Sequence, residues 1–477
     1  MSGATPGVDR LSKCGGAPVA DVSVDLVILG GGSGGYACAL RAAELGMSVV
    51  LIEKDKVGGT CLHRGCIPTK ALLHAAEIAD ATRDSAQFGV RASFEGIDMA
   101  AVDAYKDGVV GKLYKGLTGL VRSRKVQVVE GAGRLVSATE VAVGDTTYQG
   151  RHVVLATGSS PRSLPGLEID GDRVITSDHA LTLGRVPGSV IVLGGGVIGV
   201  EFASVWSSFG AEVTIVEALP HLLPTEDETS SKQIERAFRR RKIGFKVGTR
   251  FERVERTESG VRVSLAGGAQ LEAELLLVAV GRGPASAGLG FEQVGVRMER
   301  GFVVVDELCQ TSVPTISAVG DLIPTLQLAH VGFGEGILVA ERVAGLPVVP
   351  IDYAGVPRVT YSDPEVASVG LTEPQAAEKY GPDKIATVTY DLAGNGKSQI
   401  LRTSGAVKLV SVTEGPVVGV HMVGSRVGEL LAEAQLIYNW EALPAEVAQL
   451  IHAHPTQSEA VGEAHLALAG KPLHLHG

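Results

Sequence analysis

Two glycine-rich segments that repeat one pattern constrain the fold of this chain more than any other feature. Residues 25–53 begin with an apolar stretch, pass through three spaced glycines and an Ala/Leu-rich helical pattern, and end at Glu53. Residues 189–217 repeat that order and end at Glu217. The spaced glycines are Gly30, Gly32 and Gly35 in the first copy and Gly194, Gly196 and Gly199 in the second. In both copies the acid lies 23 residues after the first glycine.

This spacing is typical of dinucleotide-binding units. The first glycine allows a tight turn, the second lets the backbone approach a pyrophosphate, and the third lets the helix pack on the strand. The helix N-terminus then faces the phosphates, and the acid can accept a hydrogen bond from a ribose hydroxyl. We therefore predict an α/β fold with two Rossmann-like dinucleotide-binding domains, in preference to glycine-rich turns of an ordinary α/β sheet. Because Glu217 would repel a 2′-phosphate and no arginine directly follows it, the second site is predicted to prefer NAD(H) over NADP(H).

Length and charge restrict the class of protein. The chain has 477 residues, of which 45% are hydrophobic and 20% charged. A single core stops growing at about 250–300 residues, so several packed domains are expected. The formal net charge of -10 argues against general affinity for nucleic acid or anionic lipid, because both require an excess of Lys and Arg. The basic run at 235–242 is interpreted as a solvated helix end.

The N-terminal sequence carries no targeting signal that we can identify. Residues 1–23 lack a basic segment followed by an apolar one, and the chain has no uninterrupted run of about 20 apolar residues. We therefore predict a flexible N-terminal tail over residues 1–23 and a cytoplasmic protein that binds neither membranes nor nucleic acid.

Two of the five cysteines, Cys61 and Cys66, lie close together in the segment GGTCLHRGCIPTK, residues 58–70. Cytosolic thiols are usually reduced, so such a pair is more often catalytic or metal-binding than structural. The other three cysteines are scattered and lack ligand spacing, so we predict no metal site. Pro68 suits the first turn of a helix, and a helix N-terminus favours the thiolate form of cysteine. An irregular turn at Gly65 could bring the two sulfurs within reach of a redox-active disulfide.

A histidine far along the chain has the chemistry that a thiol–disulfide exchange requires. His454 and Glu459 lie in HAHPTQSE, residues 452–459. Histidine is the side chain whose ordinary pKa lies nearest neutrality, and a carboxylate can orient its ring. A surface or core position is the usual explanation for one of twelve histidines, so the pattern by itself does not decide the role of His454.

Taken together, these motifs resemble the pyridine-nucleotide disulfide oxidoreductase family. The resemblance extends from about residue 24 to the end. It rests on GGTCLHRGCIPTK, the two glycine fingerprints, AVGD at 318–321 followed by LAH at 328–330, and HAHPTQSE. Residues 153–158, VVLATG, and 276–282, LLVAVGR, resemble the strands by which the chain leaves and re-enters the first domain.

The resemblance implies a domain order and two cofactors. An FAD-binding domain is expected at 24–158, an NAD-binding domain at 159–280, a central segment completing the FAD domain at 281–350, and a C-terminal α+β dimerisation domain at 351–477. FAD is expected at the first glycine loop and NAD at the second. The protein is expected to be a homodimer in which a C-terminal histidine reaches the cysteines of the partner.

Residue roles follow from the same resemblance. Cys61 resembles the thiol that exchanges with substrate, Cys66 the thiol beside the flavin, His454 the base and Glu459 the group that orients it. Lys70 resembles a lysine near the flavin ring, with Glu201 as its ion-pair partner. The remaining predicted cofactor-binding residues are Gly59, Thr60, Gly133, Thr157, Gly158, Gly281, Arg282, Gly320, Asp321 and Ala329. The family pattern is not matched at His63-Arg64 or at the segment VGRGPAS from Val280.

The implied activity is oxidation of protein-bound dihydrolipoamide with reduction of NAD⁺. The implied partners are the lipoyl domains of 2-oxo acid dehydrogenase complexes or the glycine cleavage H protein. One alternative is a flavoprotein reductase for the disulfide of a low-molecular-weight thiol, such as glutathione, mycothiol or trypanothione. Another is a structural subunit whose main task is docking onto a complex core.

Overall fold

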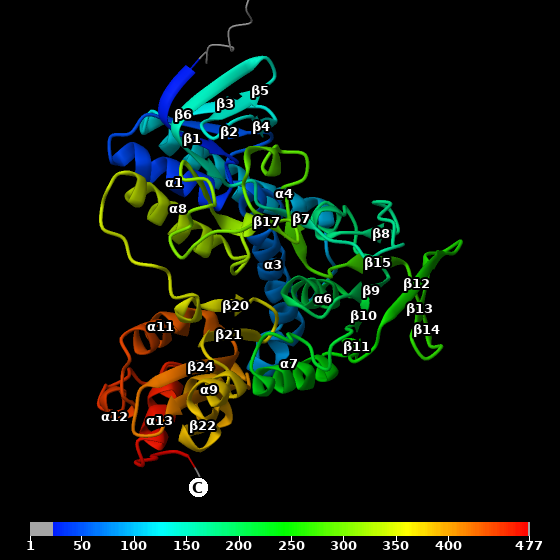
Figure 1. The fold of residues 1–477 in the computed structure, drawn as a ribbon. Helices are drawn as coiled ribbons and strands as arrows, with labels where there is room; N and C mark the ends of the chain where they lie inside the picture. Colours follow the sequence, from blue (N-terminus) through cyan, green and yellow to red (C-terminus); the bar gives the residue numbers. More distant parts are fainter. Residues whose placement is uncertain (1–21, 476–477) are drawn as a thin grey trace, which may run out of the picture.

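The computed structural model describes residues 22–475, which form mixed and parallel α/β sheets followed by an antiparallel sheet (Figure 1). The predicted α/β class is confirmed. The first strand already begins at Val22, so residues 22 and 23 of the predicted tail belong to it, and the rest of that tail lies outside the described residues. No helix in residues 22–475 is both long enough and apolar enough to cross a membrane.

The first sheet has seven strands in the order β3-β2-β1-β6-β5-β4, with β19 paired to β6. Strands β3, β2, β1, β6 and β19 run parallel, whereas β5 and β4 are antiparallel additions. Their bounds are β1 Val22–Leu29, β2 Val49–Glu53, β3 Gln127–Glu130, β4 Gly133–Leu135, β5 Glu140–Val143, β6 Thr146–Leu155 and β19 Ile316–Ala318. The late strand β19 therefore returns the chain to a sheet begun about 290 residues earlier.

Helices cover this first sheet and link it to the rest of the molecule. Helices α1 and α8 pack against each other beside it, and α3 runs from it toward the middle of the molecule (Figure 1). Their bounds are α1 Ser33–Glu44, α2 Gly59–Arg64, α3 Cys66–Asp84, α4 Met99–Ser123 and α8 Ala329–Val343. Strand residues from 26 to 29 and from 49 to 52 are almost entirely buried, as expected for a parallel sheet covered on both faces.

The second sheet is fully parallel in the order β11-β10-β9-β15-β8, and a three-stranded antiparallel sheet β12-β13-β14 projects beside it (Figure 1). The parallel strands are β8 Val174–Ile175, β9 Ser189–Leu193, β10 Glu212–Val216, β11 Gly244–Lys246 and β15 Leu275–Val278. The projecting strands are β12 Phe251–Arg256, β13 Val261–Leu265 and β14 Gln270–Ala273. The helices that accompany the parallel sheet are α5 Ser177–Ala180, α6 Val197–Phe209 and α7 Glu228–Arg240.

Short ribbons connect the two parallel sheets. Strands β7 and β16 pair antiparallel, as do β17 and β18. Their bounds are β7 Ser159–Pro161, β16 Arg282–Pro284, β17 Met298–Glu299 and β18 Phe302–Val303. Strand β7 directly follows the first sheet along the chain, and β16 follows the second. Their pairing therefore joins the two segments in which the chain passes from one sheet to the other.

The C-terminal part is an antiparallel sheet in the order β20-β21-β24-β23-β22 with helices around it. Its strands are β20 Arg358–Thr360, β21 Glu365–Gly370, β22 Ile385–Asp391, β23 Ala406–Val412 and β24 Val417–Gly424. The helices are α9 Glu373–Tyr380, α10 Gly396–Leu401, α11 Leu431–Asn439, α12 Pro444–Val447 and α13 Glu459–Leu468. In Figure 1 this part lies at the opposite end of the molecule from β1 and α1.

Candidate active site

Cys61 and Cys66 lie on either side of a break between two helices. Cys61 belongs to the short helix α2, and Cys66 is the first residue of α3. Gly65 separates the helices with φ -149° and ψ -113°, outside the helical region. A Cβ atom at Gly65 would lie 3.0 Å from the Thr60 carbonyl oxygen, so a side chain would crowd this turn. Both cysteines are half-buried free thiols.

The pKa values of the two thiols shift in opposite directions because Cys61 donates a hydrogen bond to Cys66. The hydrogen bond from Cys61 lowers the pKa of Cys66 to about 7, with a further contribution from the positive charge of Lys70, against burial and the negative charge of Glu201. The same hydrogen bond, together with burial, raises the pKa of Cys61. The pair therefore holds a thiolate at Cys66 near neutral pH while Cys61 keeps its proton.

Lys70 and Glu201 form an ion pair one helical turn from Cys66. Lys70 Nζ lies 2.9 Å from both carboxylate oxygens of Glu201, whose side chain is 4% exposed. Tyr361 joins the pair from the C-terminal part, because its backbone N–H donates to Glu201 Oε1 at 3.0 Å and its ring centre lies 4.7 Å from Lys70 Nζ. Burial would lower the pKa of Lys70, but the Glu201 carboxylate outweighs it and raises that pKa. The ammonium group beside Cys66 is therefore fixed by three separate parts of the fold.

The first glycine loop has the geometry of a phosphate cradle. Gly30 has φ +109°, and a Cβ there would lie 2.2 Å from the Ala156 carbonyl oxygen. At Gly32, by contrast, an added Cβ would meet no atom within 4 Å, so a ligand can approach the backbone at this point. The Gly31 N–H donates to Glu53 Oε2 at 2.7 Å, which ties the loop to the end of β2.

The second glycine loop repeats this geometry at α6. Gly194 has φ +113° and would place a Cβ 2.3 Å from the Ala279 carbonyl oxygen, whereas a Cβ at Gly196 would meet no atom within 4 Å. The Gly195 N–H donates to Glu217 Oε2 at 2.6 Å, and the Leu219 N–H donates to Glu217 Oε1 at 2.7 Å. A carboxylate has about four acceptor positions, so Glu217 keeps capacity for a ribose hydroxyl.

The cysteine helix packs directly on the first glycine loop. A Cβ at Gly59, the first residue of α2, would lie 2.6 Å from the Cα of Gly32. Glycine at position 59 therefore permits the two backbones to touch, and Cys61 follows two residues after this contact. The cysteine segment and the first glycine loop therefore form one continuous site.

A hydrogen-bonded chain extends this site to the β7–β16 ribbon. Arg282 Nε donates to Ser159 Oγ at 2.7 Å, and Arg282 Nη2 approaches Thr60 Oγ1 at 3.4 Å. Ser159 Oγ in turn donates to Asp321 Oδ2 at 2.5 Å. Ser159, which the sequence did not single out, thus joins Arg282 to Asp321, and Arg282 extends the chain to Thr60.

His454 and Glu459 form a pair at the other end of the molecule. His454 Nδ1 lies 2.8 Å from Glu459 Oε1, and the Thr456 N–H donates to Glu459 Oε2 at 2.8 Å. Burial alone would raise the pKa of Glu459, but these two contacts hold it below its usual value. The His454 side chain is 78% exposed. Within the described residues, no hydrogen bond or ion pair joins His454 to either cysteine of its own chain.

Comparison with known proteins identifies the family. Residues 24–336 match the family described as pyridine nucleotide-disulphide oxidoreductase, and residues 356–465 match its dimerisation domain. The chain belongs to this family. It is 41% identical over 470 residues to dihydrolipoyl dehydrogenase of Bacillus subtilis, covering 94% of this chain and 99% of the relative. It is 39% identical over 465 residues to the mitochondrial dihydrolipoyl dehydrogenase of Pisum sativum, covering 94% of this chain and 92% of the relative.

Solved structures agree with this assignment. LpdA from Mycobacterium tuberculosis superposes with a TM-score of 0.86 at 29% identity, covering 94% of this chain and 99% of that one. The flavoprotein disulfide reductase RclA from Escherichia coli gives a TM-score of 0.83 at 28% identity, covering 92% and 99%. The protein is therefore an enzyme, a flavoprotein disulfide reductase of the dihydrolipoyl dehydrogenase class, whose family uses FAD and NAD(P). The matched dimerisation domain supports a homodimer.

Most of the remaining predicted cofactor residues lie where parallel strands end, which is where ligands bind in open α/β sheets. Thr157 and Gly158 follow β6, Gly281 and Arg282 follow β15, and Gly320 and Asp321 follow β19. Ala329 begins α8. Gly133, in contrast, begins the edge strand β4, where a Cβ would lie 2.5 Å from Leu29 Cδ1. A close packing contact thus accounts for glycine at this position.

The residues present fit the two cofactors of the family. Both glycine loops leave open space at their central glycine and carry an acid at the end of the following strand. We find no group of three or more His, Cys, Asp or Glu side chains able to hold a metal ion within residues 22–475.

The sequence analysis did not single out Tyr361. Tyr361 lies 291 positions beyond Lys70, and no local pattern predicts that the two residues meet. The sequence also did not indicate a second pair, His452 and Glu433, near the predicted base. His452 Nε2 lies 2.7 Å from Glu433 Oε1 on α11. This contact anchors the segment that precedes His454.

The departure from the family pattern at His63-Arg64 is accommodated by local contacts. His63 Nε2 hydrogen-bonds with the Val57 carbonyl oxygen at 3.0 Å, and its ring meets Tyr114 of α4 edge-on with centres 5.1 Å apart. Arg64 forms an ion pair with Asp55. These contacts fasten α2 to its surroundings.

Proposed function

We propose that this enzyme oxidises protein-bound dihydrolipoamide to lipoamide and reduces NAD⁺ to NADH. The observation that carries the proposal is the continuous site in which Cys61, the Cys66 thiolate and Lys70 adjoin the first glycine loop. The relatives named dihydrolipoyl dehydrogenase match almost the whole chain at about 40% identity, which supports the same assignment.

In the proposed cycle, Cys61 and Cys66 form a disulfide that accepts two electrons from the substrate dithiol. A substrate thiolate attacks the Cys61 sulfur, Cys66 leaves as a thiolate, and the second substrate thiol then displaces Cys61 to give lipoamide. The low pKa of Cys66 favours its departure as a thiolate. FAD held at the first glycine loop would supply the electron acceptor for the Cys66 side of the pair and the hydride donor for NAD⁺.

We propose that His454 deprotonates the substrate thiol at the cysteines of the partner subunit. Its ring is exposed and held by Glu459, while its own cysteines lie elsewhere in the chain. A homodimer with complementary contacts would supply each site with the missing base. We propose Glu459 as the residue that orients His454 through Nδ1, which leaves Nε2 to receive the proton.

Glu217 is proposed to select NAD⁺ over NADP⁺. Both its oxygens are fixed by backbone N–H groups of the second glycine loop and the following turn, so the carboxylate cannot swing away from a 2′-phosphate. We propose lipoyl domains of 2-oxo acid dehydrogenase complexes or the glycine cleavage H protein as partners, and a cytoplasmic location. One relative carries the name mitochondrial, so localisation in the source cell tests the last point separately.

The decisive experiment compares dihydrolipoamide oxidation with NAD⁺ and with NADP⁺ in the purified protein. We expect rapid turnover with NAD⁺ and a large preference over NADP⁺. Turnover of a low-molecular-weight disulfide with NADPH, without dihydrolipoamide activity, would favour the alternative reductase. Absence of turnover with either substrate, in protein that holds FAD, would favour a structural subunit.

A subunit-mixing experiment tests the shared site. A general base contributes about 10²–10⁴ in rate, so His454→Gln should lose that factor with dihydrolipoamide. Diaphorase activity, which requires no thiol proton transfer, should change much less. Heterodimers of Cys61→Ser and His454→Gln subunits should regain about half the activity, because one site carries both lesions and the other neither. Verified heterodimers without recovery would show that each chain uses its own histidine.

A further inference from the structure

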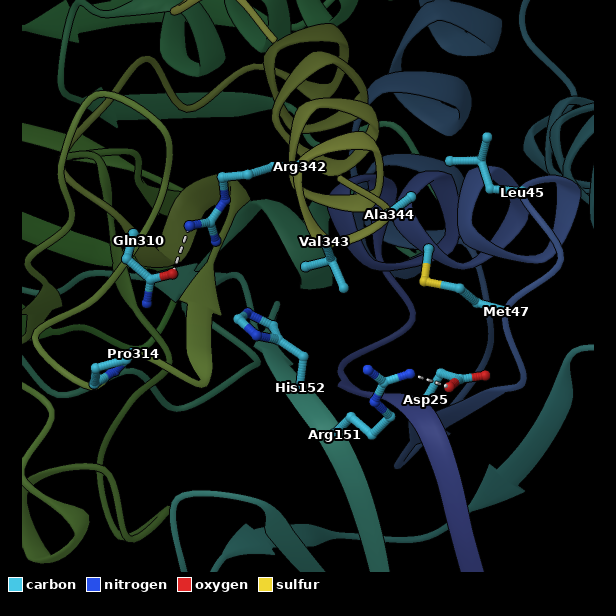
Figure 2. A pocket seen from close by; sticks show the side chains of 10 residues that line it. All are labelled: Asp25, Leu45, Met47, Arg151, His152, Gln310, Pro314, Arg342, Val343 and Ala344. Carbon is cyan, nitrogen blue, oxygen red and sulfur yellow. Dashed lines mark hydrogen bonds and ion pairs between the residues drawn. The ribbon is translucent and has the colours of Figure 1, made fainter. Parts of the chain in front are cut away.

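A second cavity lies beside the first sheet, away from the glycine loops. It has a volume of about 580 Å³ and lies beside the middle of β1 and β6 and the C-terminal ends of α1 and α8 (Figure 2). Five polar side chains line it, namely Asp25, Arg151, His152, Gln310 and Arg342. Strand residues from 26 to 29 separate this cavity from Gly30, a span of about 13 Å. It is therefore separate from the dinucleotide sites.

Arg342 carries a positive charge into this cavity without a matching carboxylate. Its Nη1 donates to Gln310 Oε1 at 2.5 Å, and its Nη2 donates to Ser317 Oγ. Figure 2 shows its guanidinium extending from α8 between Gln310 and His152. Arg342 forms no salt bridge with any residue in 22–475, and its Nε is buried with no hydrogen-bond partner there. Burial lowers the pKa of Arg342.

The neighbours of Arg342 are neutral and fixed in place. Gln310 Nε2 donates to the carbonyl oxygens of Val313 and Ile316 at 2.8 and 2.6 Å, so its Oε1 stays turned toward Arg342. Burial and the charge of Arg342 lower the pKa of His152 to about 4, which leaves its ring uncharged at neutral pH. The hydrogen bonds at Arg342 therefore orient the guanidinium without neutralising it.

The charges at the rim leave a net positive site. Arg151 is a second cation, with a side chain that is 86% exposed, and Asp25 is the one acid among the lining residues. Asp25 Oδ1 lies 3.4 Å from Arg151 Nη1, while Asp25 Oδ2 accepts from Ser48 Oγ at 2.7 Å. Asp25 thus offsets Arg151, whereas Asp306 attracts Arg342 without a salt bridge and offsets only part of the effect of its burial.

We propose that this cavity binds a small oxyanion, as a phosphate or carboxylate group, through Arg342. A half-buried guanidinium without a salt bridge is stabilised by an anion, and an arginine fork matches the geometry of phosphate and carboxylate oxygens. The cavity volume lies within the range of small-molecule sites. The ligand would bind beside β1 and β6, on the far side of strand residues 26–29 from the first glycine loop.

The test measures binding of inorganic phosphate and of succinate to the full-length, FAD-loaded protein by calorimetry. Saturating NAD⁺ blocks the second glycine loop, and chloride keeps the ionic strength constant. We expect saturable binding of at least one of the two anions. The difference between phosphate and succinate assigns the class of oxyanion.

Variants locate the binding. Arg342→Gln should weaken the affinity at least tenfold, whereas Arg342→Lys, which keeps the charge but loses the fork, should weaken it less. Arg253→Gln on the distant strand β12 removes an equal charge and should leave binding unchanged. Flavin content and thermal midpoint establish that each variant is folded. Equal binding by the wild type and Arg342→Gln, or binding of neither anion to the wild type, would refute the site.

Discussion

Replacing Cys61 by alanine should change the titration of Cys66. The hydrogen bond from Cys61 is the largest cause of the low pKa of Cys66, which is about 7 instead of the ordinary 9.0. At pH 7 a thiol with a pKa of about 7 is about half ionised, whereas one with a pKa of about 9 is about 1% ionised. Cys61→Ala should therefore reduce the thiolate fraction of Cys66 by up to roughly fiftyfold, because burial also disfavours the thiolate. The positive charge of Lys70 remains in this variant and should make the reduction smaller.

The assay follows alkylation of Cys66 by iodoacetamide as a function of pH in the anaerobically reduced protein. Cleavage after Arg64 and Lys70 separates Cys66 from Cys61, so mass spectrometry reads each thiol independently. Cys61→Ser is the matched control, since a hydroxyl can also donate to the Cys66 sulfur, and its midpoint should stay nearer that of the wild type.

Two results would refute this reasoning. If Cys61→Ala left the midpoint of Cys66 unchanged, the thiolate would owe its stability to Lys70 and the helix N-terminus instead. If Cys61→Ser raised the midpoint as far as Cys61→Ala, the donated hydrogen bond would not be the cause.

Three further predictions concern the contacts between the parts of the fold. Tyr361→Leu removes a cation–π contact with Lys70 worth about 1 kcal/mol and should raise the thiol midpoint in the same assay, whereas Tyr361→Phe should not. Lys408 lowers the pKa of Asp227 to about 2 from 3.8, although burial opposes the shift. Asp227 therefore contributes about 2 kcal/mol to the free energy of unfolding above pH 4, and this contribution is lost as the pH falls toward 2. Asp227→Asn should lower the thermal midpoint at pH 7 and make that midpoint less dependent on pH in acid. The Phe202 side chain is only 1% exposed. Phe202→Ala should therefore lower the free energy of unfolding, measured with denaturant, by about 3–5 kcal/mol.

Much of the fold could be predicted because its signals are local. Each glycine fingerprint lies between one strand and one helix, and the structure places β1 and α1, and β9 and α6, where the pattern puts them. The turn at Gly30 requires a positive φ that glycine adopts without strain. The segment AVGD at 318–321, which the sequence also singled out, begins at the last residue of β19. The residue roles at the cysteines and at His454 stay predictions that the proposed experiments test.

The sequence by itself determined the two dinucleotide-binding units, the proximity of Cys61 to Cys66 along the chain, and the family resemblance, because each rests on residues close together in the chain. The packing of the fold, in contrast, places Tyr361 against Lys70 and Glu201, joins Arg282 to Asp321 through Ser159, and sets Arg342 in the cavity beside β1 and β6. These contacts join residues far apart in sequence. The packing of whole sheets and helices decides which of these residues meet. No local period or spacing in the sequence encodes that packing.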